Sequence, residues 1–232
     1  MRLQSKFIPV LLTLVIGSFG FAQQQQPPQE TGPFRQSDLV ELIKLDPTIK
    51  LDIRYATKNN FLGKPVYKEA RAFLQRPAAE ALVRINQSLR KQGYGLIIHD
   101  GYRPWYVTRI FWDVTPEDKK IFVADPAKGS RHNRGCAVDL TLMDATGKEI
   151  DMGTPYDFLG KLAEPRHEET FLAEGKLTQV QLDNRHILRD AMVAGGFKTI
   201  PNEWWHFNYL TGEELHAAYK PLDVPFEQLS AH

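Results

Sequence analysis

The 232-residue sequence has a single cysteine, Cys136, which excludes a disulfide within the chain and is expected to be a small buried side chain. It has no excess of charge, because 29 lysines and arginines balance 28 aspartates and glutamates. Neither a basic surface for nucleic acid nor an acidic tail is therefore expected. After residue 22 the sequence has no apolar run near the roughly 20 residues that a membrane-spanning helix needs. These absences favour a globular domain without nucleic-acid or membrane partners.

Residues 1–22 have the pattern of an export signal. Arg2 and Lys6 supply the positive start, residues 7–16 form a short apolar core, and a small-x-small cleavage pattern ends at Ala22. The apolar core is shorter than the roughly 20 residues of a membrane anchor, which favours cleavage. Together with the lone cysteine, this signal predicts export to a bacterial periplasm.

The rest of the chain divides into a short linker and one domain. Residues 23–36 begin with a run of glutamines and prolines, which predicts a disordered linker, and residues 37–232 form the functional domain. Apolar periodicity predicts helices over 77–92, from 115 onward and over 179–194, and strands over 50–55, 95–100, 138–142 and 203–209. This mixture indicates an α+β fold, an antiparallel sheet with helices packed on it.

The stretch over residues 130–142 carries the first candidate site. Its second half alternates as a strand does, with apolar side chains on one face and Asp139 on the other. An unpaired carboxylate on the inward side of an apolar strand is costly, so a positive partner must lie against Asp139. A divalent metal bound by Asp139 and by His132 would satisfy this requirement. An ion pair between Asp139 and either Arg131 or Arg134 is the alternative.

A second unusual stretch, residues 201–207, is rich in aromatic side chains but carries Glu203 and His206. Polar groups in an apolar wall need partners. His206 joins His132 and Asp139 to give two imidazoles and a carboxylate, the ligand set of a catalytic zinc site that leaves one position open for water. Glu203, three residues from a ligand, is then placed to act as a general base.

Three motifs in this order resemble the D-alanyl-D-alanine dipeptidases of the VanX type, within the larger group of zinc D,D-peptidases. The resemblance extends from about residue 52 to about residue 209 and includes Cys136, where a smaller residue is expected. The motifs are Asp100-Gly101-Tyr102-Arg103-Pro104, Ser130-x-His132-x-x-Gly135-x-Ala137-x-Asp139 and Glu203-x-Trp205-His206.

The resemblance implies one Zn²⁺ per chain and further roles for single residues. Arg103 corresponds to a donor that stabilises the oxyanion of the transition state, although an ion pair with a neighbouring aspartate is the alternative. Asp157 corresponds to the residue that pairs with the ammonium group of the substrate, and Ser130 to one that helps to hold its terminal carboxylate. Tyr55 is a further candidate for substrate contact, with simple packing as the alternative.

We therefore expect a zinc peptidase that hydrolyses the small dipeptide D-Ala-D-Ala during cell-wall peptide turnover. A D,D-carboxypeptidase or endopeptidase that acts on peptidoglycan stem peptides is the first alternative, and it would need an open cleft. A zinc-containing protein that binds wall fragments without hydrolysis is the second, and it would not need Glu203 or Arg103.

Overall fold

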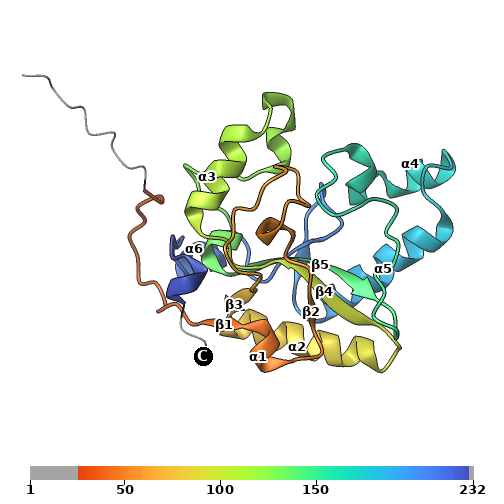
Figure 1. Ribbon diagram of the computed structural model, residues 1–232, viewed down its shortest axis with the longest axis horizontal. Coiled ribbons are helices and arrows are strands. Elements are labelled where there is room, and N and C mark those ends of the chain that lie inside the picture. The colour runs from red at the N-terminus through yellow and green to blue at the C-terminus, as the bar shows by residue number, and fades with distance from the viewer. Residues whose placement is uncertain (1–25, 230–232) are drawn as a thin grey trace, which may run out of the picture.

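The computed structural model describes residues 26–229, in which a five-stranded sheet and a two-stranded sheet are covered by helices (Figure 1). The five strands lie in the order β2-β4-β5-β7-β6, and they are antiparallel except for the parallel pair β2 and β4. The two-stranded sheet pairs β1 with β3 in antiparallel register. The expected α+β fold, with one domain and a largely antiparallel sheet, is thereby confirmed.

The elements have the following bounds. The strands are β1 (Leu39–Glu41), β2 (Lys50–Leu51), β3 (Phe73–Gln75), β4 (Gly95–Asp100), β5 (Ala137–Met143), β6 (Lys198–Thr199) and β7 (His206–Asn208). The α-helices are α1 (Leu42–Leu45), α2 (Arg76–Arg90), α3 (Trp105–Val114), α4 (Glu168–Ala173), α5 (Gln179–Ala194) and α6 (Gly212–Ala218).

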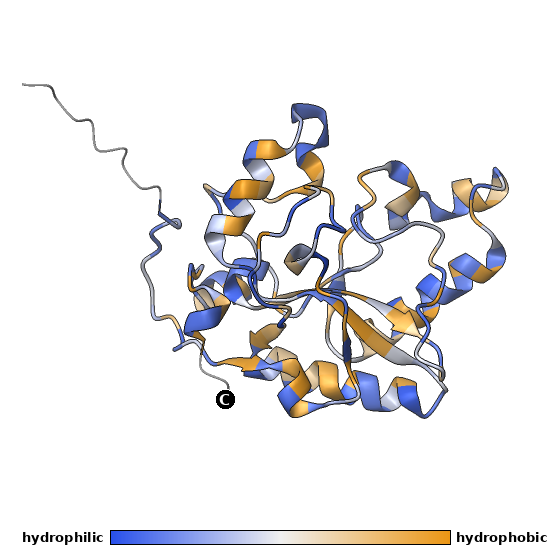
Figure 2. Ribbon diagram, viewed as in Figure 1, coloured by the Kyte–Doolittle hydropathy of each residue, from blue (hydrophilic) through white to orange (hydrophobic). Residues whose placement is uncertain are grey.

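The two long helices α2 and α5 pack against each other and against the central strands β4 and β5. Helix α5 begins with a capping box, in which the Thr178 hydroxyl accepts a hydrogen bond from Gln181 N and the Gln181 side chain accepts one from Thr178 N. The buried face of α2 includes Leu82, Ile85 and Leu89. The apolar colouring of β4 and β5 and the polar outer faces of these helices mark where the core lies (Figure 2).

Strand alternation separates the core from the site. Val138 and Leu140 belong to the core cluster with Phe207, whereas Asp139 on β5 lies directly opposite His206 on β7, on the other face of the sheet. A β-bulge in β4 shifts the register so that Asp100 also lies opposite Asp139. The fold thus brings three polar side chains from three adjacent strands to one place.

The prediction of a helix from residue 115 onward was wrong. The α-helix α3 starts directly after Pro104 and ends at Val114, just before the predicted helix begins. The residues after Pro116, Glu117–Phe122, form a 3-10 helix instead. Helix α3 buries Val107 and Phe111, and this packing stabilises an α-helix after Pro104. The residues after Pro116 bury no side chain and form only a 3-10 helix.

Two predicted strands are shorter than expected. β2 ends at Leu51, and Arg54–Ala56 forms a 3-10 turn. β7 begins at His206, so Glu203 lies in the bend before the strand. That bend matters, because residues three apart in a regular strand face opposite sides of a sheet.

The segment over residues 26–36 has no regular secondary structure, yet it is attached to the domain. Glu30 forms an ion pair with Arg134, and the backbone N–H of Arg35 donates to Ala218 O. The prediction of a disordered linker rested on composition, which carries no information on contacts with residues far along the chain. The predicted export signal lies outside the described residues. Within residues 26–229, no helix is long and apolar enough to cross a bilayer.

Candidate metal centre and catalytic site

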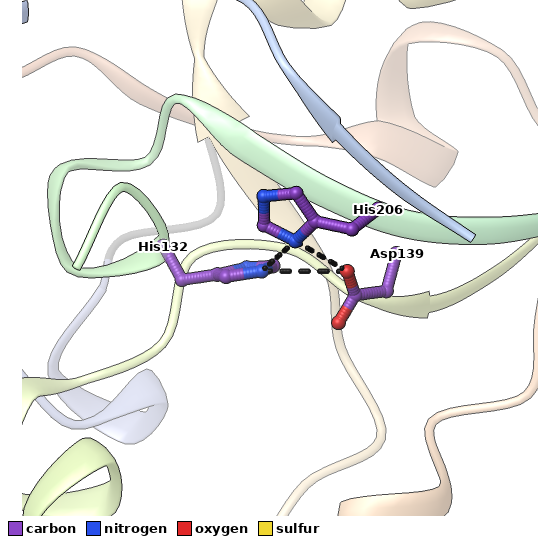
Figure 3. A group of neighbouring side chains, drawn as sticks. All are labelled: His132, Asp139 and His206. Atoms are coloured by element: carbon purple, nitrogen blue, oxygen red, sulfur yellow. Dashed lines mark hydrogen bonds and ion pairs between the residues drawn. The ribbon is translucent and has the colours of Figure 1, made fainter. Parts of the chain in front are cut away.

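The side chains of His132, Asp139 and His206 converge on one point (Figure 3). The Nε2 atom of His132 lies 3.1 Å from His206 Nδ1 and 3.4 Å from Asp139 Oδ1, and His206 Nδ1 lies 3.0 Å from the same oxygen. All three residues are buried. His132 comes from the 3-10 turn His132–Arg134, which Gly135 ends in the left-handed conformation with φ 68°.

The outer hydrogen bonds of the two imidazoles fix which ring nitrogens face the centre. His132 Nδ1 lies 2.7 Å from Gly101 O and His206 Nε2 lies 2.9 Å from Asn208 Oδ1. An oxygen of this kind only accepts, so these two nitrogens carry the hydrogens. In the neutral form that binds metals, each ring would then present the lone pair of its inner nitrogen, and a shared cation would stabilise two such lone pairs that face each other.

Asp139 is held in its charged form. Burial raises its pKa, but His132 and His206 outweigh this effect and hold the pKa of Asp139 well below its usual range. Its second oxygen accepts a hydrogen bond from Tyr156 Oη at 3.0 Å. The alternative partner Arg134 pairs with Glu30 instead. Among the described residues, the ion-pair partners of Asp139 are His132, His206 and Arg103, and neither Arg131 nor Arg134 pairs with it.

These residues fit a zinc ion. Four ligands at about 2.0–2.1 Å in a tetrahedral arrangement lie roughly 3.3 Å from one another, and the three distances between ligand atoms here are 3.0, 3.1 and 3.4 Å. Two imidazole nitrogens and one carboxylate oxygen are ligand types that zinc takes in catalytic sites. Among the described residues, no fourth histidine, cysteine, aspartate or glutamate joins this group, which suits a catalytic zinc site with three protein ligands.

Glu203 lies beside this centre, with Oε2 3.8 Å from His206 Nδ1. Burial raises the pKa of Glu203 to about 7, although His206 opposes the shift. A carboxylate with a pKa near neutrality can both accept and return a proton. The bend before β7 brings this side chain into the same cavity as His206, which a regular strand would not do for residues three apart.

Arg103 forms an ion pair with Asp100 and also lines the cavity. Its Nε and Nη2 atoms each lie 2.8 Å from Asp100 Oδ2, which is the expected ion pair. The same Nη2 lies 3.6 Å from Asp139 Oδ2, and the guanidinium lines the cavity beside the candidate metal ligands. The ring of Phe111 lies 4.7 Å below the guanidinium carbon. The ion pair with Asp100 therefore orients the Arg103 guanidinium, which still lines the cavity.

Asp157 is the most strained residue of the site. Its φ of 62° lies in the left-handed region, and it is the only non-glycine residue among those described with a positive φ. Its Oδ2 atom is buried and has no hydrogen-bond partner among the described residues. Burial raises the pKa of this carboxyl well above its ordinary range. A buried carboxyl oxygen without a hydrogen-bond partner at the cavity wall is suited to a cationic ligand group, which would favour the ionised form that burial disfavours.

Ser130 and Tyr55 also line the cavity. The Ser130 hydroxyl accepts a hydrogen bond from Asn133 N at 3.1 Å, so its own hydrogen remains available to a ligand. The local turn bond and a ligand contact are therefore compatible at Ser130. Tyr55 packs at 4.6 Å from the Phe111 ring centre and lies under Arg103 at 5.6 Å. The ring of Tyr55 thus packs against two other residues of the cavity wall.

A single cavity of about 420 Å³ joins all the predicted site residues. This volume lies within the roughly 300–1,000 Å³ typical of small-molecule sites. The predicted residues that line it are Tyr55, Arg103, Ser130, His132, Asp139, Asp157, Glu203 and His206.

Sequence reasoning missed two partners of the candidate ligands, Tyr156 and Asn208. Asn208 follows His206 by two residues and so shares its strand face, a signal that was present in the sequence. No local pattern pointed to Tyr156, because its hydrogen bond joins a loop to β5.

Comparison with known proteins identifies the family of the chain. Residues 35–225 match the Peptidase_M15 family, described as D-ala-D-ala dipeptidase. The D-alanyl-D-alanine dipeptidase of Escherichia coli K12 is 34% identical over 171 residues, which cover 74% of this chain and 84% of that protein. The D-alanyl-D-alanine dipeptidase of Enterococcus faecium is 33% identical over 178 residues, covering 68% and 85%.

Two solved structures are more distantly similar. An LD-carboxypeptidase, LdcB, is 20% identical with a TM-score of 0.40 and covers 77% of this chain and 71% of its own. A mutant of the D,D-pentapeptidase VanY in complex with Zn(II) is 18% identical with a TM-score of 0.31 and covers 62% and 76%.

Proposed function

Because the chain belongs to the D-ala-D-ala dipeptidase family Peptidase_M15 and is a metallopeptidase, we propose that it hydrolyses free D-alanyl-D-alanine to two D-alanines with one zinc ion per chain. The observation that carries the proposal is the set of distances of 3.0 to 3.4 Å between the facing atoms of His132, Asp139 and His206. Those three residues are the proposed ligands. Bound there, zinc would supply a Lewis acid that makes water a nucleophile near neutral pH and polarises the peptide carbonyl.

Glu203 is the proposed general base and acid. As water attacks the carbonyl carbon, the Glu203 carboxylate accepts a proton from it, and the carboxylic acid then returns this proton to the leaving amine nitrogen. A pKa of about 7 suits both halves of this cycle. The peptide C–N bond breaks as the amine is protonated. The proton that remains on the acyl product passes to the released amine, so the products leave as a carboxylate and an ammonium.

Arg103 is the proposed donor to the carbonyl oxygen as negative charge develops on it. Its guanidinium is already oriented by Asp100 at 2.8 Å, so little reorganisation is needed when the charge appears. One such donor contributes roughly a hundred- to a thousand-fold in rate in enzymes of this kind.

The two ends of a free dipeptide are proposed to bind Asp157 and Ser130. The buried, unpartnered Oδ2 of Asp157 supports an ammonium contact, and the available hydroxyl hydrogen of Ser130 supports a carboxylate contact. Tyr55 packs beside Arg103 and would contribute a wall of the cavity. A substrate whose amine is acylated loses the contact with Asp157, which distinguishes a dipeptidase from a carboxypeptidase.

The decisive experiment compares free D-Ala-D-Ala with N-acetyl-D-Ala-D-Ala at equal concentration, with zinc content measured on the same preparation. We expect about one zinc per chain and hydrolysis of the free dipeptide at least a hundred-fold faster than the acetylated one, about 2.7 kcal/mol of discrimination. Comparable rates on both substrates would favour the carboxypeptidase alternative. An active preparation free of metal would contradict the zinc assignment.

We further propose that the protein works in the periplasm, on dipeptide released during wall turnover. Support comes from the export pattern of residues 1–22. Mass spectrometry of the mature chain is expected to find Gln23 at its N-terminus, in a periplasmic extract. A chain that retains Met1 in the cytoplasmic fraction would contradict this localisation.

A further inference from the structure

Arg134 carries a charge that is buried beside the candidate metal centre. It is 1% exposed and follows His132 by two residues in the same 3-10 turn. A buried guanidinium needs both a counter-charge and acceptors for its hydrogens. Arg134 has a backbone acceptor at Tyr219 O and a neighbouring imidazole nitrogen, His216 Nδ1, at 3.2 Å.

Its counter-charge comes from outside the part of the chain that matches the family. Glu30 accepts two hydrogen bonds from Arg134, at 2.6 Å to Oε1 and 2.8 Å to Oε2. A side-by-side pair of this kind is among the stronger ion pairs in proteins. Glu30 belongs to the N-terminal strap, residues 26–36, most of which precedes residue 35, where the family match begins.

The N-terminal strap also approaches the neighbouring loop. A Cβ atom placed on Gly129 would lie 3.7 Å from Pro28 Cγ, so the strap runs close to the residue before Ser130. The strap therefore supports, from the outer side, the loop that carries Ser130 and His132. On the inner side, His132 is held by its bond to Gly101 O at 2.7 Å.

We propose that Glu30 is a positioning residue for the metal centre, which acts by neutralising and holding Arg134 so that the turn presents His132 Nε2 to the other two ligands. The inference rests on the proposed metal role of His132. Without the Glu30 carboxylate, a buried cation is left with only neutral acceptors, and the turn must move to bring it toward water. A change of this kind in the support of a ligand typically weakens metal binding by roughly ten- to a hundred-fold.

The test is Glu30→Gln in the otherwise unchanged protein, with Glu69→Gln as the matched control. Glu69 also pairs with an arginine, Arg71 at 3.1 Å, and does not line the cavity. The zinc dissociation constant is measured by competition with a chromophoric chelator, and kcat and KM for D-Ala-D-Ala are measured at saturating zinc. We expect Glu30→Gln to bind zinc about ten-fold more weakly and the control to stay within about two-fold of the unaltered protein.

A second pair of variants tests whether Glu30 acts through Arg134 or only attaches the N-terminal strap to the domain. Arg134→Met removes the buried cation, so adding Glu30→Gln to it should weaken zinc binding no further. Zinc affinity within two-fold of the unaltered protein in Glu30→Gln overturns the proposal, even if thermal stability falls. If Arg134→Met does not fold, the comparison of Glu30→Gln with Glu69→Gln decides alone. Because zinc affinity is read without substrate, a failure to hydrolyse the dipeptide would overturn the proposed function and leave this result intact.

Discussion

The Tyr156 hydroxyl donates a hydrogen bond of 3.0 Å to Oδ2 of Asp139, while the other oxygen of that carboxylate faces both imidazoles. The tyrosine thereby sets the rotation of a candidate metal ligand. Its ring is fixed in turn, because it stacks on His99 at 4.5 Å. One oxygen of Asp139 thus accepts the orienting hydrogen bond, and the other is available to the candidate metal.

This relationship predicts that Tyr156→Phe weakens zinc binding by roughly ten-fold, because the carboxylate loses the contact that orients it. Loss of a buried hydrogen bond to a charged group also costs about 1.5–3 kcal/mol of unfolding free energy. Chelator competition and urea unfolding measure the two effects. Tyr106→Phe, on α3 and away from the cavity, is the control, and an equal effect there would show that hydroxyl loss alone is responsible.

Glu203→Gln is expected to lower kcat by roughly a hundred- to ten-thousand-fold, since the amide cannot accept the proton of the attacking water. Zinc content should remain about one per chain, because Glu203 is not a proposed ligand. Metal analysis and single-turnover kinetics test the two halves of this prediction. The same substitution at exposed Glu169 on α4 serves as control. Activity within ten-fold of the unaltered enzyme would remove Glu203 from the role of base.

Asp157→Asn is expected to raise KM for the free dipeptide by roughly ten- to a hundred-fold, because a charge-assisted hydrogen bond to the ammonium is lost. Asparagine tolerates the left-handed backbone, so the fold should be kept. Preference for the free over the acetylated dipeptide should fall in the same variant. An unchanged preference would mean that the ammonium binds elsewhere.

Cys136 is expected to be unreactive in the folded protein. The side chain is fully buried, and burial raises the pKa of its thiol to about 12. Iodoacetamide at pH 8 should therefore leave activity and mass unchanged, whereas the protein unfolded in urea should gain one adduct. Rapid modification of the native protein would show that the loop around Cys136 opens.

The acid stability of the fold is expected to depend on Asp46, which is 7% exposed. Burial raises its pKa, but hydrogen bonds from Thr48 and Asn86 outweigh burial and place the pKa of Asp46 below its ordinary value of 3.8. A lowered folded-state pKa gives stability that is present above the ordinary value and is lost as the pH falls through the folded value.

Asp46→Ala should therefore lower the unfolding free energy by about 1.5–3 kcal/mol at pH 7 and by less at pH 3. Urea titrations at the two pH values measure the difference. Asp113→Ala, at an exposed site on α3, is the control. A deficit that is the same at both pH values would mean that packing, not charge, stabilises this turn.

The sequence allowed the face of the sheet on which Asp139 lies to be predicted, because strand alternation acts over a few residues. Asp139 had to face away from Val138 and Leu140, and the structure has it so. The bounds of α5 were also predicted, since a glycine follows its end, and the structure adds a capping box of Thr178 and Gln181 at its start. Local signals of this kind predict where a helix begins and ends without knowledge of tertiary contacts.

The parts that could not be predicted depend on contacts between distant segments. Pro104 and Pro116 both precede helical turns, and only the burial of Phe111 decides which turn becomes an α-helix. Glu30 looked like part of a polar linker because its partner, Arg134, lies 104 positions later. Tyr156 was missed for the same reason. Composition and periodicity carry no information on such pairs.

The turn after His132 closes at Gly135, and the surroundings of that glycine leave little space for a side chain. A methyl group added to its Cα would come within 2.5 Å of Leu39 Cδ2, in addition to straining the left-handed backbone. The backbone N of Gln75, 3.3 Å from the same position, is harder to displace than the leucine methyl. The geometry that presents His132 thus depends on close packing of this turn against β1 and β3, two strands that lie outside the main sheet.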